Sequence, residues 1–240
     1  MRTSPFCLVA GLSLFAVPVL ADIAYVSGVQ TSTGTVDAFP AGIHTTQSYD
    51  IAAPDPLTSW APPDQMIAVQ SGSAAADLHT RYVSTLDPSR FVLHAELVRS
   101  HAVVQASTTF DQTTTLSMTF SEPTLVSLSA AVSRESIMNI SVNDVPMSIR
   151  FGKDGEAPLF DLTYAGQTHW HDSFPATQLV LGPGTYTLSS FNHVYAVTAG
   201  SISDVFTSSI DFSLVVVPSP SALAPMLAMA GVGCGGRRRR

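Results

Sequence analysis

The densest cluster of polar and aromatic side chains in the chain is residues 168–174, which read THWHDSF. Side chains two positions apart on a strand project to one side, so a strand would place His169 and His171 on the same face. The face of Trp170 suits a pyranose ring, and short polar neighbours can hydrogen-bond sugar hydroxyls. The segment is therefore a candidate glycan contact. The simpler alternative is an exposed loop whose tryptophan packs on the domain.

Metal ligation has one candidate set, His94, Glu96 and His101. His94 and Glu96 share the polar face of an expected strand, which favours structural or solvated roles over coordination. Neither an H-E-x-x-H motif nor a D-x-D-x-D-G calcium loop is present. We therefore expect neither a metal nor a cofactor.

Motifs for nucleophilic catalysis are missing from the sequence. It has no G-x-S-x-G, and Lys153 is its only lysine, with no serine three residues before it, which rules out S-x-x-K and P-loop chemistry. Sequence alone cannot bring any two of the acids together as a general acid and base. The acids considered for such a pair are Glu96, Glu122, Glu135 and Asp161. We expect a non-enzymatic protein.

Apolar and polar residues alternate through most of the chain, which is the pattern of half-buried antiparallel strands. The alternating runs are 90–99, 116–120, 126–132, 138–142, 147–151, 160–164, 185–188 and 210–216. Turn-forming residues separate several of them, at 121–124, 143–146, 153–156 and 182–184. Short strands with regular turns predict an all-β domain, an antiparallel β-sandwich with a jelly-roll-like arrangement.

Two segments need separate interpretation. In residues 73–86, Leu78, Tyr82 and Leu86 are spaced as in a helix, but the β-branched residues between them favour a strand, which we predict. Residues 22–65 are expected to form an N-terminal strand and a proline-rich loop, because four prolines surround Trp60. We assign residues 66–217 to the sandwich proper.

The stretch LGPGTYTLSS predicts a specific contact. Gly182, Pro183 and Gly184 form a tight corner, and Tyr186 opens the next strand. A tyrosine in this position often bonds its hydroxyl back across the connection, as in the tyrosine corner of β-sandwiches.

The body of the chain, residues 22–217, is strongly acidic. It has six basic against eighteen acidic residues, a formal net charge of −12 with histidine neutral. Such a surface repels nucleic acid and anionic lipid, so we expect no nucleic-acid partner. Both cysteines, Cys7 and Cys234, lie outside the body, which excludes disulfides there. The body must therefore rest on an apolar core.

Residues 1–21 have the layout of a secretory signal peptide. Arg2 precedes an apolar run from Phe6 to Leu20, and Ala21 ends a short segment of small and aliphatic residues. We expect export through a Sec-type translocon and cleavage after Ala21 by signal peptidase. An uncleaved anchor is the alternative, although the run is short for a membrane span.

The last 23 residues combine a proline motif, a short apolar segment and a basic end. As a helix, residues 222–236 would measure about 22 Å against a hydrocarbon core of about 30 Å. The arginines at the end would stay in the cytoplasm and leave the body outside. The residues that define this tail are Pro218, Ser219, Pro220, Arg237, Arg238, Arg239 and Arg240.

This order of features resembles the PEP-CTERM sorting signal of exported bacterial proteins, with Ser219 in place of the usual glutamate. In that family an exosortase in the membrane is thought to process the tail. The body, with runs such as SIDFSLVVVPSP, is also similar to the β-rich domains carried on such tails. The resemblance implies residues 218–240 as a short transmembrane sorting helix and an exosortase-like membrane protease as partner.

The sequence thus predicts an exported, non-enzymatic β-sandwich that is briefly tethered to the membrane and then resides at the cell surface or in the exopolysaccharide matrix. Two alternatives stay open. One is a carbohydrate-binding module that uses His169, Trp170 and His171, with Trp60 in its loop. The other is an enzyme acting on an extracellular polysaccharide, which would need two acids or a metal in a cleft.

Overall fold

The computed structural model describes residues 22–39, 43–102, 106–136, 142–144, 146–164, 169–198 and 204–218. The expected cleavage residue Ala21 and the tail residues Ser219, Pro220 and Arg237 to Arg240 lie outside these ranges, whereas Pro218 is described and exposed. In the ranges given, no helix has the length and hydrophobicity needed to cross a membrane.

The described part of the chain is built from strands. They are β1 (Ala24–Ala38), β2 (Thr45–Ala52), β3 (Gln65–Ser71), β4 (Ala74–Asp87), β5 (Arg90–Ala102), β6 (Ala106–Phe120), β7 (Thr124–Ser136), β8 (Val142–Asp144), β9 (Met147–Lys153), β10 (Phe160–Tyr164), β11 (His169–Leu181), β12 (Gly184–Thr198) and β13 (Asp204–Val216).

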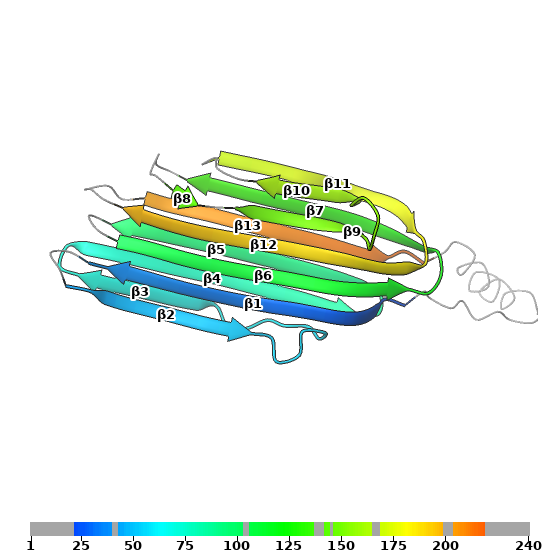
Figure 1. Cartoon of the computed structure of the whole chain (residues 1–240), viewed down its shortest axis with the longest axis horizontal. Helices are drawn as coiled ribbons and strands as arrows, with labels where there is room; N and C mark the ends of the chain where they lie inside the picture. The colour runs from blue at the N-terminus through cyan, green and yellow to red at the C-terminus, as the bar shows by residue number, and fades with distance from the viewer. Residues whose placement is uncertain are drawn as a thin grey trace, which may run out of the picture. The chain divides into compact units, whose positions relative to one another are not determined.

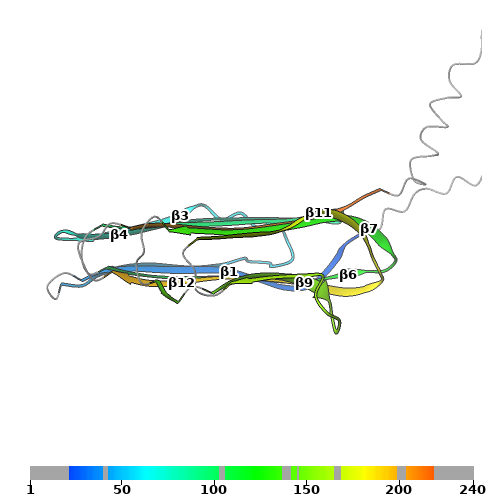
Figure 2. The ribbon, with the colours of Figure 1, turned by 90° about the horizontal axis from the view of Figure 1, so that it is seen from above.

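The strands form two antiparallel sheets that pack face to face (Figures 1 and 2). Sheet A has the order β10-β9-β12-β6-β1-β2, with the short β8 also paired to β12. Sheet B has the order β11-β7-β13-β5-β4-β3. This arrangement confirms the predicted all-β sandwich. The segment 73–86, for which a helix was the alternative, forms β4.

The core follows from the alternation of side chains along the strands. In β6 every second residue is buried, from Ala106 to Phe120, and the residues between are half exposed. Two apolar clusters form between the sheets. The larger one contains a group of rings. The ring centroid of Phe212 on β13 lies 5.3 Å from that of Phe91 and 5.6 Å from that of Phe151.

A buried polar layer lies between the two apolar clusters. On β6 it consists of Gln112 and Thr114, which lie between Phe110 of one cluster and Leu116 of the other. On β13 it is Ser208, between Phe206 and Ile210. Hydrogen bonds join the sheets across this layer. For example, Tyr82 of β4 donates to Gln30 Oε1 of β1 at 2.8 Å, and Ser84 Oγ donates to the same oxygen at 2.6 Å.

Two arginines belong to the interior, Arg99 of β5 and Arg134 of β7, at 0% and 2% exposure. Both guanidinium groups lie 5.2 Å from the centroid of Phe206 on β13, the strand between β5 and β7. Arg134 Nη2 also donates to Asn192 Oδ1 of sheet A at 3.1 Å. Burial lowers the pKa of Arg134 to about 10, although the charge of Tyr164 acts in the opposite direction. Arg134 therefore remains a cation at neutral pH.

The N-terminal region is more ordered than its sequence suggests. β1 has 15 residues and lies inside sheet A between β6 and β2, β2 follows at Thr45–Ala52, and the proline-rich loop around Trp60 covers residues 53–64. The inward residues of β1 include Gln30, Ser32 and Gly34, which give no apolar alternation. A Cβ on Gly34 would clash with the ring of Tyr49 and would lie 2.6 Å from Leu78 Cδ2, so a larger residue here would displace both side chains. Trp60 of the loop packs on Tyr82, with ring centroids 4.8 Å apart.

One predicted turn differs from the structure, and one predicted strand lies largely outside the described ranges. The turn expected at 143–146 is partly a strand, because β8 covers Val142–Asp144. Of the strand expected at 138–142, residues 138–141 lie outside the described ranges.

The predicted tyrosine corner is confirmed, because Tyr186 donates its hydroxyl to the Gly182 carbonyl at 3.1 Å. Replacing Tyr186 with phenylalanine should lower the free energy of unfolding by about 1 kcal/mol, the net value of one hydrogen bond. Phe120 and Phe151, which pack on the ring, should keep their contacts. Urea unfolding measures the difference, and a variant as stable as the wild type would contradict a stabilising corner.

Candidate functional site

The predicted glycan contact lies on β11, the edge strand of sheet B, and is therefore part of a strand rather than a loop. The register with β7 places His169 opposite Glu135 and His171 opposite Ser133. On the next strand, Thr207 of β13 lies opposite Glu135. These side chains line a shallow depression of about 390 Å³. It offers hydroxyl, carboxylate and imidazole groups, all of which can hydrogen-bond a polar ligand.

The side chain of Trp170 faces the core, whereas the two histidines face solvent. His169 and His171 are exposed, whereas Trp170 is half-buried and packs against the larger apolar cluster. Its ring stacks on Tyr164 of β10, with centroids 4.7 Å apart and ring planes 24° from parallel. One face of the indole is therefore occupied within the protein. Contact between Trp170 and a sugar ring would be limited to what remains exposed.

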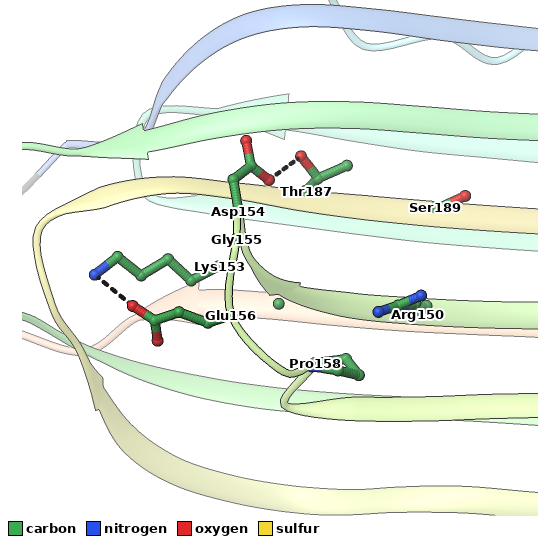
Figure 3. Close-up of a pocket in the computed structure, with 9 residues that line it drawn as sticks. Arg150, Lys153, Asp154, Gly155, Glu156, Pro158, Thr187 and Ser189 are labelled. Carbon is green, nitrogen blue, oxygen red and sulfur yellow. Dashed lines mark hydrogen bonds and ion pairs between the residues drawn. The ribbon is translucent and has the colours of Figure 1, made fainter.

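A second depression lies at the β9–β10 hairpin on sheet A and measures about 270 Å³ (Figure 3). Its charged side chains are held by neighbours: Lys153 Nζ lies 3.0 Å from Glu156 Oε1, and Thr187 Oγ1 donates to Asp154 Oδ1 at 2.8 Å. The hydrogen bond and charge of Glu156 raise the pKa of Lys153. Exposed pairs of this kind contribute little stability.

Of the residues considered for a metal site, His94 and Glu96 lie together, with His94 Nε2 3.9 Å from Glu96 Oε2, but His101 lies on the other face of the sheet. His94 lies on the outer face of sheet B, where Nδ1 is 2.7 Å from Asp211 Oδ1. His101 is buried between the sheets, where Nε2 is 2.6 Å from Thr108 Oγ1. Within the described ranges, no group of three or more His, Cys, Asp or Glu residues could hold a metal ion together.

A set of aromatic side chains that sequence reasoning missed lies on the outer face of sheet A. Phe191, His193 and Tyr195 occupy alternate positions of β12, all directed away from the core. His193 Nδ1 lies 2.6 Å from Asp111 Oδ1 of β6. The signal that could have revealed the set is the alternation in SSFNHVYAV, where rings stand at every second position.

Comparison with known proteins identifies no family. No protein-family description and no curated protein matches the chain. Among solved structures, it shows a weak similarity to "Structure of infectious bursal disease virus Gx strain", with a TM-score of 0.18 at 10% identity over 87% of this chain and 74% of that one. A mutant VP2 protein of the same virus, in T=1 particles, gives a TM-score of 0.14 at 10% identity over 85% and 80%. Scores this low indicate neither a shared fold nor a shared function.

Proposed function

We propose that this chain is an exported, non-enzymatic β-sandwich protein that a PEP-CTERM-like tail sorts to the cell surface or the exopolysaccharide matrix. The observation that supports the proposal is the extent of the fold. Both sheets are built from residues 24–216, the part of the chain between the candidate signal peptide and the candidate tail. Removal of residues 1–21 and 218–240 would therefore take away none of the described strands.

The proposal includes a single jelly-roll-like domain between the two signals. From β5 to β7 and again from β10 to β13, consecutive strands alternate between the two sheets, which favours this arrangement. Signal peptidase, a Sec-type translocon and an exosortase-like protease are the partners that the terminal segments require. The acidic body is directed to the outside, where its charge keeps it soluble.

Mass spectrometry of the protein isolated from the cells that export it tests the proposal. We expect an N-terminus at Asp22 and a C-terminus upstream of Arg237. A variant with glutamine at Arg237 to Arg240 should keep its tail, because the basic end that stops transfer is lost. A wild-type protein that ends at Arg240 would contradict processing, and one that keeps Met1 would contradict cleavage of the signal peptide.

The depression on β11 supports a second candidate function, glycan binding by His169, Trp170 and His171. Its favourable feature is the set of polar groups beside the β11 histidines on the next two strands, Glu135 and Ser133 of β7 and Thr207 of β13. Loss of retardation in a polysaccharide-containing gel on Trp170→Ala would support this site.

A further inference from the structure

We propose that the outer face of sheet A binds a chain of an uncharged polysaccharide along β12, through Phe191, His193 and Tyr195. This face lies on the opposite sheet from the β11 depression. The proposal goes beyond sorting to the cell surface, because it assigns a ligand to the domain that is sorted.

The three rings form a continuous stripe. Residues at i, i+2 and i+4 of one strand cover about 13 Å, which is long enough to meet several sugar units of an extended chain. The ring planes of Phe191 and His193 are within 5° of parallel, with centroids 6.1 Å apart. Tyr195 is 40% exposed. The stripe therefore combines two parallel, partly exposed rings with the more exposed ring of Tyr195.

The centre of the stripe is fixed in place. His193 lies directly opposite Asp111 in the register of β12 and β6, and the 2.6 Å contact between them orients the imidazole. The backbone amide of His193 also donates to the Pro146 carbonyl at 2.9 Å. A surface that is ordered before binding loses less conformational entropy when a ligand arrives.

Hydroxyl groups flank the rings on the neighbouring strands. Tyr195 lies opposite Thr109 and Phe191 lies opposite Thr113, and β1 continues the same rows on the far side of β6. Adjacent strands are about 4.8 Å apart, and threonine has a stiff χ1, so these hydroxyls form a regular array. The threonines concerned are Thr109 and Thr113 of β6 and Thr31, Thr33 and Thr35 of β1.

The chemistry of this surface selects an uncharged polysaccharide. Aromatic rings stack on the apolar faces of sugars, and the hydroxyl array can donate to and accept from sugar hydroxyls. Asp111 and His193 within the stripe engage each other, and Arg150 Nε on the outer face of β9 lies 4.0 Å from Asp161 Oδ2, so these basic groups already face carboxylates. The net charge of −12 on the body repels such a polymer as well.

The position of the stripe also favours an extended ligand. β12 pairs with β6 along its whole length, and its other side pairs with β9 as far as Asn192 and with the short β8 at Tyr195 and Ala196, so the rings lie beside the continuous surface of β6, β1 and β2 (Figure 1). Trp170, by contrast, has one ring face stacked on Tyr164 and lies on an edge strand.

Affinity electrophoresis of the full-length protein tests the proposal, with hydroxyethylcellulose in the gel as the uncharged polysaccharide and alginate as the acidic one. We expect retardation by hydroxyethylcellulose alone. Phe191→Ala and Tyr195→Ala should each weaken binding at least about tenfold, the usual effect of truncating a central aromatic contact. Met66→Ala on β3 of sheet B is the matched control, because it removes an exposed apolar side chain (74% exposed) elsewhere.

Each other outcome overturns the proposal. These are wild-type protein that hydroxyethylcellulose does not retard, retardation by alginate in its place, or unchanged binding by both ring variants when thermal melts show that they are folded. Loss of binding in Trp170→Ala, with the ring variants unaffected, would transfer glycan binding to the β11 depression. Mass spectrometry tests the processing of the two termini separately. A protein that is not processed would therefore not change the result of the gel-retardation experiment.

Discussion

Replacing Phe206 with leucine is expected to lower the free energy of unfolding by about 3 kcal/mol, because the loss of core volume combines with the loss of two buried cation–π contacts. Phe206 is fully buried, and the guanidinium groups of Arg99 and Arg134 both lie 5.2 Å from its ring centroid. Leucine keeps an apolar side chain at this position but has no ring quadrupole. Two cations held away from water would then lose a favourable contact each.

The matched control is the same replacement at Phe212, six residues along β13. Phe212 is also buried, and its ring contacts are with phenylalanines rather than with arginines. We expect Phe206→Leu to cost at least about 1 kcal/mol more than Phe212→Leu in urea unfolding, the difference that desolvated cation–π contacts predict. Equal costs would mean that the arginines gain nothing from the ring.

Much of the fold could be predicted because β-strands show their burial in the sequence. The alternation in RFVLHAELVR and in TTTLSMTF determines which side chains face inward, and the structure buries Phe91, Leu93 and Leu116 accordingly. The same phase places Arg99 and His101 on the inner face. The alternation therefore predicted that Arg99 and His101 are buried, although arginine and histidine are more often found at the surface.

β1 could not be predicted in full because much of its inner face is polar, so the apolar alternation that marks a strand is missing there. Its inner face carries Gln30 and Ser32, which belong to the polar layer, and Gly34, which leaves room for the side chains of Tyr49 and Leu78. Polar side chains are buried at low cost when partners on the opposite sheet satisfy them, and those partners are distant in sequence. Gln30 receives hydrogen bonds from Tyr82 and Ser84, more than 50 residues away.

The candidate sites illustrate the same limit. Trp170 stands out in the sequence because its neighbours are polar, yet the fold stacks its ring on Tyr164. Phe191 and Tyr195 look like core residues by type, but the phase of β12 directs them outward while Ser190 and Asn192 face the polar layer. The pairing of β12 with β6, which brings hydroxyl groups beside the rings, is a non-local contact that no short motif encodes.

Acidification is expected to destabilise the sandwich through His101, by about 2 kcal/mol between pH 6.5 and pH 4.5. His101 is 2% exposed, and burial, with a further contribution from the charge of Arg99, lowers its pKa from 6.5 to about 3. Above pH 6.5 the imidazole is neutral in both the folded and the unfolded chain, and its contribution to stability is complete. As the pH falls from 6.5 towards 3, the unfolded chain binds a proton that the folded chain does not, so stability is lost across this window.

Urea unfolding of the wild type and of His101→Gln at pH 6.5, 5.5 and 4.5 measures this contribution. Glutamine can still hydrogen-bond Thr108 but does not titrate, so the variant should lose about 2 kcal/mol less than the wild type over the same interval. His171→Gln, at an exposed position of β11, controls for the loss of an imidazole. If the free energy of unfolding falls equally with pH in the wild type and in His101→Gln, His101 gains its proton in the folded state. It would then be a second cation beside Arg99.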